Sequence, residues 1–147
     1  MAGDSGSADA LAHQVAQGMY ARDVAARETM GIEILEAAEG RAVLRMVVHP
    51  LHLNGHAVCH GGFVFTLADT AFAYACNSRN KVTLAASAMI DFLKPSREGD
   101  VLTCTAAEQW TEGRHGVYNM TVANQRGEVV ALFRGKSAQI GGSVIPE

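Results

Sequence analysis

The chain has 147 residues, of which 48% are hydrophobic and 18% are charged. This length and composition are typical of one compact domain with a substantial core, and they argue against a disordered chain. The formal net charge is −3 and lysine and arginine form no dense run, so a nucleic-acid partner is not expected.

The N-terminal sequence and the cysteines bear on where the protein works. The start, M-A-G-D-S-G-S-A-D, lacks the basic and apolar regions of a signal peptide. The longest apolar run lies within residues 54–78, but polar side chains interrupt it and it is too short to span a bilayer. The three cysteines, an odd number without framework spacing, are Cys59, Cys76 and Cys104. We therefore expect a cytoplasmic protein with reduced thiols and no membrane segment, and with Cys76 and Cys104 buried.

The first predicted element is an amphipathic helix from Ala8 to about Arg27. Its apolar residues recur at helical spacing and are Leu11, Val15, Met19 and Val24. Residues 1–7 are rich in glycine, serine and aspartate and are expected to form a flexible tail. We expect residues 8–142 to form a single domain and residues 143–147 to form a C-terminal tail.

Strand signals flank a long central helix. Two strands are predicted at residues 30–37 and 41–49, then a loop at 50–59 and a helix from about Gly61 to Ser78. Four strands follow, and turn signals place them at residues 82–93, 101–111, 115–124 and 128–140. This order predicts an α+β domain in which an antiparallel sheet curls around one helix.

The strand at residues 82–93 shows an alternating pattern. One predicted face carries Val82, Leu84, Ala86, Ala88, Ile90 and Phe92. The other face carries Ser87 and Asp91. Strict alternation predicts a strand with one apolar face.

The central helix begins at His60-Gly61-Gly62 and is apolar on nearly every side, as expected of a buried helix. The first backbone N–H groups of a helix lack internal partners, and the helix dipole places positive potential there. Glycines let a substrate oxygen approach this backbone, which suits a carbonyl that gains negative charge during attack. The same glycine pair also fits close packing of the helix on the sheet, and the pair alone does not decide between the two interpretations.

Asp69 is the one carboxylate of this helix. At helical spacing it falls on a narrow polar stripe with Thr66, Thr70 and Asn77. Burial raises the pKa of a carboxyl group, a property common to catalytic bases and nucleophiles. The structural alternative is an aspartate that is bonded to Thr70 or to the backbone.

The spacing between the glycines and Asp69 has a geometric consequence. Gly61 and Asp69 are eight residues apart, which is about 12 Å along a helix. An aspartate side chain does not reach a carbonyl bound at the N-terminus of its own helix. If both groups act on one carbon, the second helix must come from another copy of the chain, so a catalytic role predicts a dimer with two shared sites.

The other candidate sites are weaker. Four histidines, at positions 49, 52, 56 and 60, superficially resemble a metal cluster, but Pro50 and Gly55 predict a loop, and no metal site is expected. His60 is better interpreted as part of the helix start or as a hydrogen-bond donor to substrate. Cys59 beside His60 is weak evidence for a thiol–base pair, and the sequence contains no nucleophile elbow, dinucleotide fingerprint or P-loop.

Together these residues resemble a known family, the hotdog-fold acyl-CoA thioesterases. The resemblance covers about Gly31 to Gly142 and is strongest with the phenylacetic-acid-degradation type. The residues that carry it are Asn54, His60, Gly61, Gly62, Asp69, Thr70 and Ser87.

The resemblance implies a curled sheet around the central helix and dimers that pair into a homotetramer. It implies that the Gly61 N–H, supported by Gly62, forms the oxyanion hole, and that Asn54 positions water or the acyl group. His60 would orient the thioester. Asp69 of the neighbouring subunit would attack or activate water, with Thr70 and Ser87 beside it.

Substrate contacts are expected from two further groups. Candidates to line the acyl pocket are Phe63, Phe72, Tyr74 and Met89, although most of these fit an ordinary core equally well. Candidates for the CoA phosphates are Lys94, Arg97, Arg134 and Lys136, each of which also fits a solvated surface position.

The function that follows is hydrolysis of an acyl-CoA, phenylacetyl-CoA or a ring-hydroxylated relative, without a metal or redox cofactor. Two alternatives stay open. One is a hotdog dehydratase in which His60 and Asp69 act as acid and base on a β-hydroxyacyl group. The other is a non-catalytic acyl-CoA-binding protein.

Overall fold

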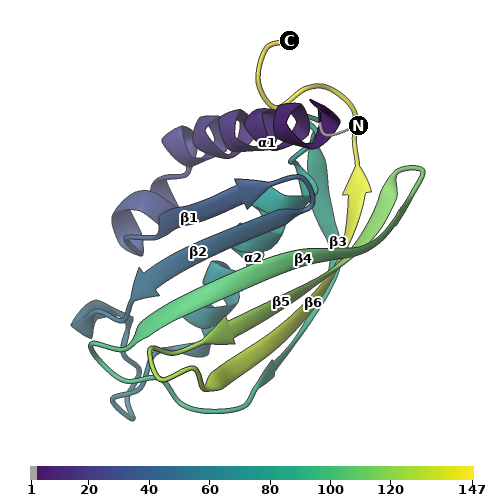
Figure 1. Ribbon diagram of the computed structural model, residues 1–147. Helices are drawn as coiled ribbons and strands as arrows, with labels where there is room; N and C mark the ends of the chain where they lie inside the picture. Colours follow the sequence, from purple (N-terminus) through teal and green to yellow (C-terminus); the bar gives the residue numbers. More distant parts are fainter. Residues whose placement is uncertain (1–2) are drawn as a thin grey trace.

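The computed structural model describes residues 3–147 of the chain, and Figure 1 shows its arrangement. The helical elements are α1 (Gly3–Arg22), the π-helical turn η1 (Ala25–Thr29), the 3₁₀ turn η2 (Pro50–His52) and α2 (Gly61–Cys76). The strands are β1 (Glu33–Ala38), β2 (Arg41–Val47), β3 (Thr83–Phe92), β4 (Val101–Glu112), β5 (His115–Ala123) and β6 (Val129–Gln139).

All six strands form one antiparallel sheet in the order β1-β2-β4-β5-β6-β3. The sheet curls around α2, and α1 lies beside β1 (Figure 1). The predicted α+β domain, with an antiparallel sheet around one helix, is therefore confirmed. The predicted strands agree with the observed ones to within a few residues.

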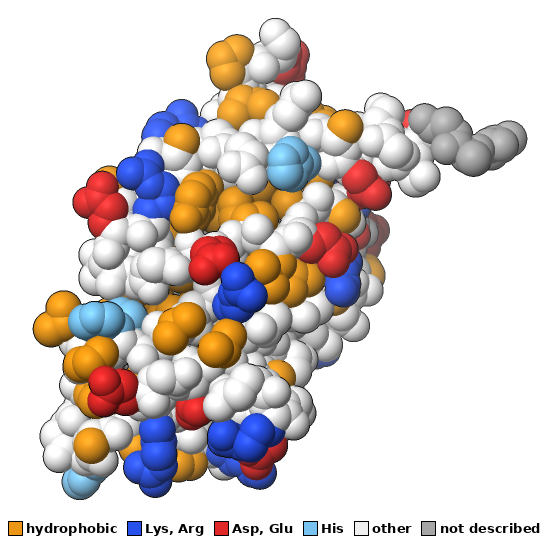
Figure 2. All heavy atoms as spheres, turned by 60° about the vertical axis from the view of Figure 1, so that its left-hand side comes forward, with side chains coloured by type: hydrophobic (Ala, Val, Ile, Leu, Met, Phe, Trp, Pro, Cys, Tyr) orange, Lys and Arg blue, Asp and Glu red, His pale blue; other side chains and the backbone are white. Residues whose placement is uncertain are grey.

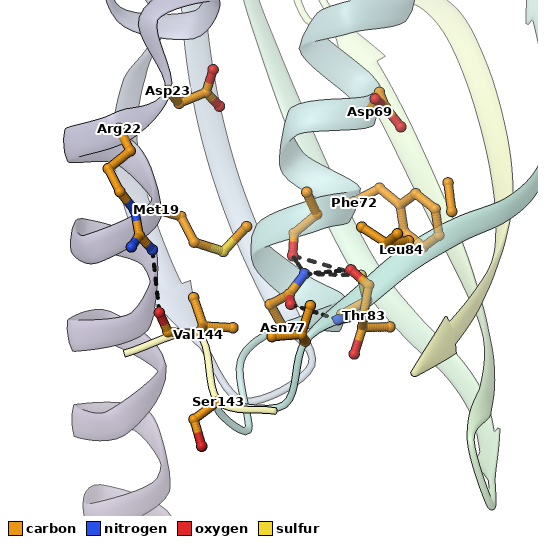
Figure 3. A pocket seen from close by; sticks show the side chains of 14 residues that line it. Met19, Arg22, Asp23, Asp69, Phe72, Asn77, Thr83, Leu84, Ser143 and Val144 are labelled. Atoms are coloured by element: carbon orange, nitrogen blue, oxygen red, sulfur yellow. Dashed lines mark hydrogen bonds between the residues drawn. The ribbon is translucent and has the colours of Figure 1, made fainter. Parts of the chain in front are cut away.

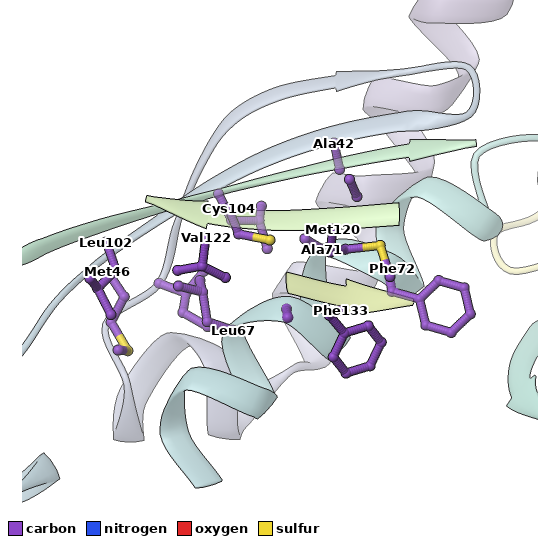
Figure 4. Packing of buried hydrophobic residues seen from close by; sticks show 14 of the residues in the cluster. Ala42, Met46, Leu67, Ala71, Phe72, Leu102, Cys104, Met120, Val122 and Phe133 are labelled. Atoms are coloured by element: carbon purple, nitrogen blue, oxygen red, sulfur yellow. The ribbon is translucent and has the colours of Figure 1, made fainter. Parts of the chain in front are cut away.

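The core lies between α2 and the concave face of the sheet. Leu67 and Ala71 of α2 are fully buried, and Figure 4 shows them facing Cys104 of β4 and Val122 of β5. All three cysteines are free and buried, as predicted for Cys76 and Cys104. Burial of these side chains removes apolar area from water at about 25 cal/mol per Å², which is what holds α2 inside the sheet.

The N-terminal helix differs from its prediction. Helix α1 already includes residues 3–7, which we expected in a flexible tail, and it ends at Arg22 rather than near Arg27. Asp23 ends it, because the Asp23 carboxylate accepts a hydrogen bond from the Ala26 N–H (3.1 Å) and the chain turns into η1. The C-terminal residues 143–147 have no helix or strand, but Ile145 packs on Gly18 of α1 and its N–H donates to Asn80.

Strand β3 is an edge strand, and its predicted alternation is wrong. A β-bulge between Ala85 and Ser87 shifts the register against β6, so Leu84 pairs with Ala138 whereas Ile90 pairs with Phe133. These two partners lie on opposite faces of β6, and the six apolar residues therefore do not share one face. The sequence pattern could not reveal the extra residue of a bulge.

Two further observations concern the surface. Within residues 3–147, no helix is long and apolar enough to cross a membrane. On the face shown in Figure 2, basic side chains lie next to acidic ones, and hydrophobic side chains are interspersed among them.

Candidate active site

The N-terminus of α2 presents a free backbone donor. His60 is the N-cap, and its Nδ1 accepts a hydrogen bond from the Gly62 N–H at 3.3 Å. Within residues 3–147 no acceptor is found for the Gly61 N–H. Since Nδ1 accepts, a neutral His60 carries its proton on Nε2 and presents a donor there. The Gly62 amide is occupied by His60, which leaves Gly61 as the donor for a ligand oxygen.

Phe92 of β3 covers Gly61 and leaves little room for a side chain there. A Cβ placed on Gly61 would lie 3.1 Å from the tip of the Phe92 ring. Both interpretations that the sequence left open therefore hold for Gly61. It allows close packing against the sheet, and within residues 3–147 its N–H has no acceptor.

Asn54 organises the turn before α2. Its side-chain oxygen accepts hydrogen bonds from the N–H groups of His56 (2.9 Å) and Val58 (3.3 Å). These bonds fix the orientation of the amide, and within residues 3–147 the Asn54 Nδ2 group donates to no protein atom. The turn thus presents a side-chain donor close in sequence to the Gly61 amide.

Asp69 is half-buried and, within the described residues, its carboxylate makes no hydrogen bond. Its pKa is raised, first by burial and then by the negative charge of Asp23. The expected structural alternative, a bond to Thr70, is absent, because the Thr70 hydroxyl donates to the Thr66 carbonyl at 2.7 Å. An unpartnered carboxylate is costly to bury, and such groups concentrate at functional sites.

The remaining members of the polar stripe have structural roles. The Thr66 hydroxyl donates to the Gly62 carbonyl at 2.9 Å. The Asn77 amide donates to the Thr83 carbonyl (3.0 Å) and its oxygen accepts from the Thr83 N–H (2.9 Å). Asn77 therefore joins the end of α2 to the start of β3, and within the part of the chain that the structure describes Asp69 is the one member of this stripe without a hydrogen-bond partner.

Asp69 lines a pocket of about 560 Å³ between α1, α2, the start of β3 and residues 143–144, shown in Figure 3. Phe72, Leu84 and Met19 give this pocket an apolar wall. Gly61 lines a different pocket, of about 260 Å³, together with Lys94 and Ser96. The Ser96 hydroxyl is buried and has no hydrogen-bond partner among the described residues. Within one subunit, then, Gly61 and Asp69 open into separate cavities.

The other predicted contact residues are dispersed. Ser87 is exposed on β3 next to the bulge, and Met89 is 65% exposed on the same strand. Phe63 packs against His52 with ring centroids 4.7 Å apart and the rings tilted at 46°, and Tyr74 is buried. Of the four candidates for the acyl pocket, only Phe72 lines the Asp69 pocket.

The candidate CoA-binding residues also lie apart. Lys94 lines the Gly61 pocket and donates a hydrogen bond to Glu128, whereas Arg134 of β6 donates one to the Asn119 side chain of β5. Neither Arg97 nor Lys136 lines either of the two pockets.

The histidines and Cys59 are engaged in the fold. His52 is buried, and its Nδ1 accepts from the His49 N–H while its Nε2 lies 3.1 Å from the Thr29 carbonyl. The pKa of the Cys59 thiol is raised to about 11 by burial, so it is not a reactive thiolate at neutral pH. A thiol–base pair of Cys59 and His60 is therefore not supported.

One residue at the site was missed by sequence reasoning. Asp23, at the end of α1, lies in the wall of the Asp69 pocket. No sequence signal connects two aspartates 46 residues apart on different helices, and only the packing of α1 beside α2 brings them together.

Comparison with known proteins identifies the family and the fold. Residues 56–131 match the Thioesterase superfamily. The acyl-coenzyme A thioesterase PaaI of Escherichia coli is 48% identical over 92% of this chain and 96% of its own length. The solved structure of that protein, from the phenylacetic acid degradation operon, superposes with a TM-score of 0.90. It covers 92% of this chain and 97% of the other.

A second solved structure, the phenylacetic acid degradation protein PaaI of Thermus thermophilus in a mutant form, is 35% identical. It has a TM-score of 0.74 and covers 78% of this chain and 97% of the other. The chain therefore belongs to the thioesterase superfamily, and its curled sheet around α2 is the hotdog fold that the resemblance implied.

Proposed function

We propose that this protein is an acyl-CoA thioesterase that hydrolyses phenylacetyl-CoA or a ring-hydroxylated relative to the free acid and CoA. The observation that carries the proposal is a pair of unsatisfied groups on α2: the Gly61 N–H, a donor, and the Asp69 carboxylate, an acceptor. A thioester carbonyl needs both, one for its oxygen and one for attack at its carbon.

The chemistry requires two subunits. Gly61 and Asp69 are eight residues apart on one helix, about 12 Å, and they open into separate pockets. We therefore place the Gly61 of one subunit against the Asp69 of its partner, which gives two shared sites per dimer.

Strand β3 is the surface that would bring the two helices together. It is a ten-residue edge strand with exposed apolar side chains, including Leu84 (54%), Met89 (65%) and Phe92 (56%). The other edge strand, β1, carries charged residues in ion pairs with β2 and lies beside α1. A long apolar edge is a template for pairing with a second chain. Pairing of β3 with its own copy about a two-fold axis joins the sheets and places the two α2 helices on the same side.

In this site the Gly61 N–H binds the thioester oxygen, and the Asp69 carboxylate either attacks the carbon or takes a proton from an attacking water. The resulting oxyanion is stabilised at the N-terminus of α2. The C–S bond then breaks and CoA leaves as a thiolate that takes up a proton. In the first route, water hydrolyses the mixed anhydride and restores Asp69. Isotopic oxygen from labelled water found in Asp69 after turnover would identify that route.

The other proposed site residues orient the substrate or support Gly61 and Asp69. The free Asn54 amide and the His60 Nε2–H are donors that orient the substrate, and Gly62 supports the loop by capping on His60. We further propose that Thr70 and Ser87 lie beside the carboxylate of Asp69 in the assembled site, and that Phe63 contacts the substrate from the first turn of α2.

The substrate class rests on the relatives and on the two pockets. The Escherichia coli relative is an acyl-CoA thioesterase and its gene lies in a phenylacetic acid degradation operon. The Asp69 pocket, about 560 Å³ with an apolar wall, has room for an aryl acyl group. In the Gly61 pocket, Lys94 and the unpartnered Ser96 hydroxyl offer polar contacts for the CoA arm.

We further propose that dimers pair into a tetramer and that the enzyme is cytoplasmic, where free thiols such as its three cysteines persist.

Mixed dimers test the shared site. Gly61→Pro removes the N–H at the first helical position, where proline is tolerated, and the preceding residue has the extended backbone that proline requires (His60, φ −59°, ψ 133°). Gly61→Ala is the matched control, because it adds a Cβ beside Phe92 but keeps the N–H.

The Asp69→Asn and Gly61→Pro homodimers are expected to keep only about a thousandth and about a hundredth of the wild-type kcat, respectively. A mixed dimer of the two, purified through separate tags, contains one intact site and is expected to recover about half of the wild-type turnover. An inactive mixed dimer whose parents are folded and dimeric would overturn the shared-site arrangement.

A second experiment tests the interface. Met89→Lys on β3 is expected to give folded monomers without turnover, whereas Leu35→Lys, at an exposed apolar position of β1, leaves the dimer and its activity intact. An active Met89→Lys monomer would contradict the proposal.

The reaction itself is assayed by thiol release over a panel of aryl and alkyl CoA esters. Release of free CoA with highest kcat/KM for phenylacetyl esters supports the proposal. Formation of an enoyl product instead, or tight binding without turnover, would replace it with one of the alternatives.

A further inference from the structure

The Asp69 pocket contains a second carboxylate. Asp23, at the end of α1, and Asp69, on α2, both line it, and Figure 3 shows them at the same end of the cavity on the two facing helices. No step of the proposed hydrolysis uses Asp23.

Asp23 is fixed in place by two hydrogen bonds. One carboxylate oxygen accepts from the Ala26 N–H at 3.1 Å, and the other accepts from the Tyr74 hydroxyl at 3.1 Å. Tyr74 is buried in α2, one turn and a little more beyond Asp69, so this contact ties the end of α1 to the helix that carries Asp69. The negative charge of Asp23 is thus held at a defined position relative to Asp69.

The other side chains that line the pocket add one charge, that of Arg22, which is exposed and therefore screened by solvent. Of the side chains that line it, α1 also supplies Arg22, which is exposed and donates to the Val144 carbonyl at 3.2 Å. Helix α2 supplies Cys76, whose thiol pKa is raised to about 12 by burial and which is therefore neutral. The residues of β3 and of the C-terminal segment that line the pocket are uncharged. In the proposed dimer, His60 of the partner subunit and Lys94 of the partner subunit, from the pocket that contains Gly61, would also be titratable groups at the site.

We propose that Asp23 is a positioning residue that acts on Asp69 through its charge and sets the acid side of the pH range in which the enzyme works. This inference rests on the proposed function. Two carboxylates in one partly desolvated cavity disfavour simultaneous ionisation, so Asp69 holds its proton more tightly than it would alone. The pKa of Asp69 is accordingly raised by its burial and by Asp23. A carboxylate with a higher pKa is a stronger base and nucleophile once it is ionised.

The test is the pH profile of kcat/KM for thiol release from phenylacetyl-CoA. Asp23→Asn removes the charge but retains an amide that can bond the Tyr74 oxygen and the Ala26 N–H. Its acid midpoint is expected to move to lower pH. One pH unit below the wild-type midpoint, the variant should keep about twice the wild-type fraction of its own plateau rate, or more.

Two controls separate charge from structure. Tyr74→Phe removes the hydroxyl contact but leaves the Asp23 charge, and it is expected to keep the wild-type acid midpoint. Added salt should narrow the difference between wild type and Asp23→Asn, because it screens the interaction. An unchanged midpoint in folded Asp23→Asn, or an equal shift in Tyr74→Phe, would overturn the inference.

A readout without activity distinguishes this inference from the proposed function. Carbon-13 NMR of labelled aspartate carboxyls, assigned with Asp69→Asn, follows the titration of Asp69 directly in wild type and Asp23→Asn. If Asp69→Asn retains turnover, the proposed mechanism fails while this titration still tests the coupling. If Asp69 titrates identically in both proteins, the coupling to Asp23 is wrong whatever the reaction.

Discussion

The two ends of α2 differ in whether their polar groups have hydrogen-bond partners. At the C-terminal end, Asn77 uses its side-chain donor and acceptor on Thr83 and thereby joins the helix to β3. At the N-terminal end, His60 caps Gly62 but leaves the Gly61 N–H without an acceptor in the described chain. The fold is strengthened where these groups are satisfied, and chemistry becomes possible where they are not.

Asp69 extends this contrast into the middle of the helix. The hydroxyls of its neighbours Thr66 and Thr70 donate hydrogen bonds to backbone carbonyls one turn earlier in the helix. The Asp69 carboxylate, in contrast, has no hydrogen-bond partner among the described residues, and its pKa is raised. Variants of unpaired groups should therefore change turnover, and variants of paired groups should change stability.

The largest expected effect is at Asp69. Asp69→Asn keeps the side-chain shape but removes the charge that attacks or activates water, so kcat should fall about a thousandfold or more, or about 4 kcal/mol. Single-turnover and steady-state thiol release measure this, and KM should change little. Near-normal turnover would remove Asp69 from the mechanism.

The next effect is at Gly61. Loss of one oxyanion donor in Gly61→Pro should lower kcat about a hundredfold, whereas Gly61→Ala should lose distinctly less. Both variants are compared by kcat at saturating substrate and by thermal unfolding. Equal losses in the two would assign the role of Gly61 to packing against Phe92 rather than to its N–H.

A substitution at the C-terminal end of α2, where the polar groups are paired, should lower stability and leave kcat nearly unchanged. Asn77→Ala leaves the buried Thr83 N–H and carbonyl without their partners, and it should lower the free energy of unfolding by about 2 kcal/mol. Denaturant unfolding measures this, and the fraction that remains folded should keep a near-normal kcat. A stable but inactive Asn77→Ala protein would place Asn77 in the site.

The smallest expected effect is a gain in stability on replacing Asp69, the proposed catalytic residue. Because the folded-state pKa of Asp69 is raised, its ionised form opposes folding at pH values above that pKa, and the penalty disappears as the pH falls through it. Asp69→Asn should therefore be more stable than wild type at neutral pH, by up to about 1 kcal/mol. Thermal unfolding at several pH values should show the difference shrinking in acid; a constant difference would point to a cause other than ionisation.

Much of the fold and the separation of Gly61 and Asp69 could be predicted from the sequence because they depend on local patterns. The helix from Gly61 is marked by its glycines and its continuous apolar run, and the strands by alternation and by glycine-containing turns. The separation of Gly61 and Asp69 follows from helix geometry alone. The bulge in β3 and the end of α1 at Arg22 were not predictable, because each depends on contacts made after the elements pack.

By itself the sequence determined two groups of the proposed site, since residue type and spacing along one helix fix the chemistry of Gly61 and Asp69 and the distance between them. Only the tertiary structure decided which of those groups are left unpaired and that Asp23 joins Asp69 in one pocket. The physical reason is that hydrogen-bond satisfaction and burial are properties of packed neighbours, and these neighbours come from parts of the chain that are distant in sequence.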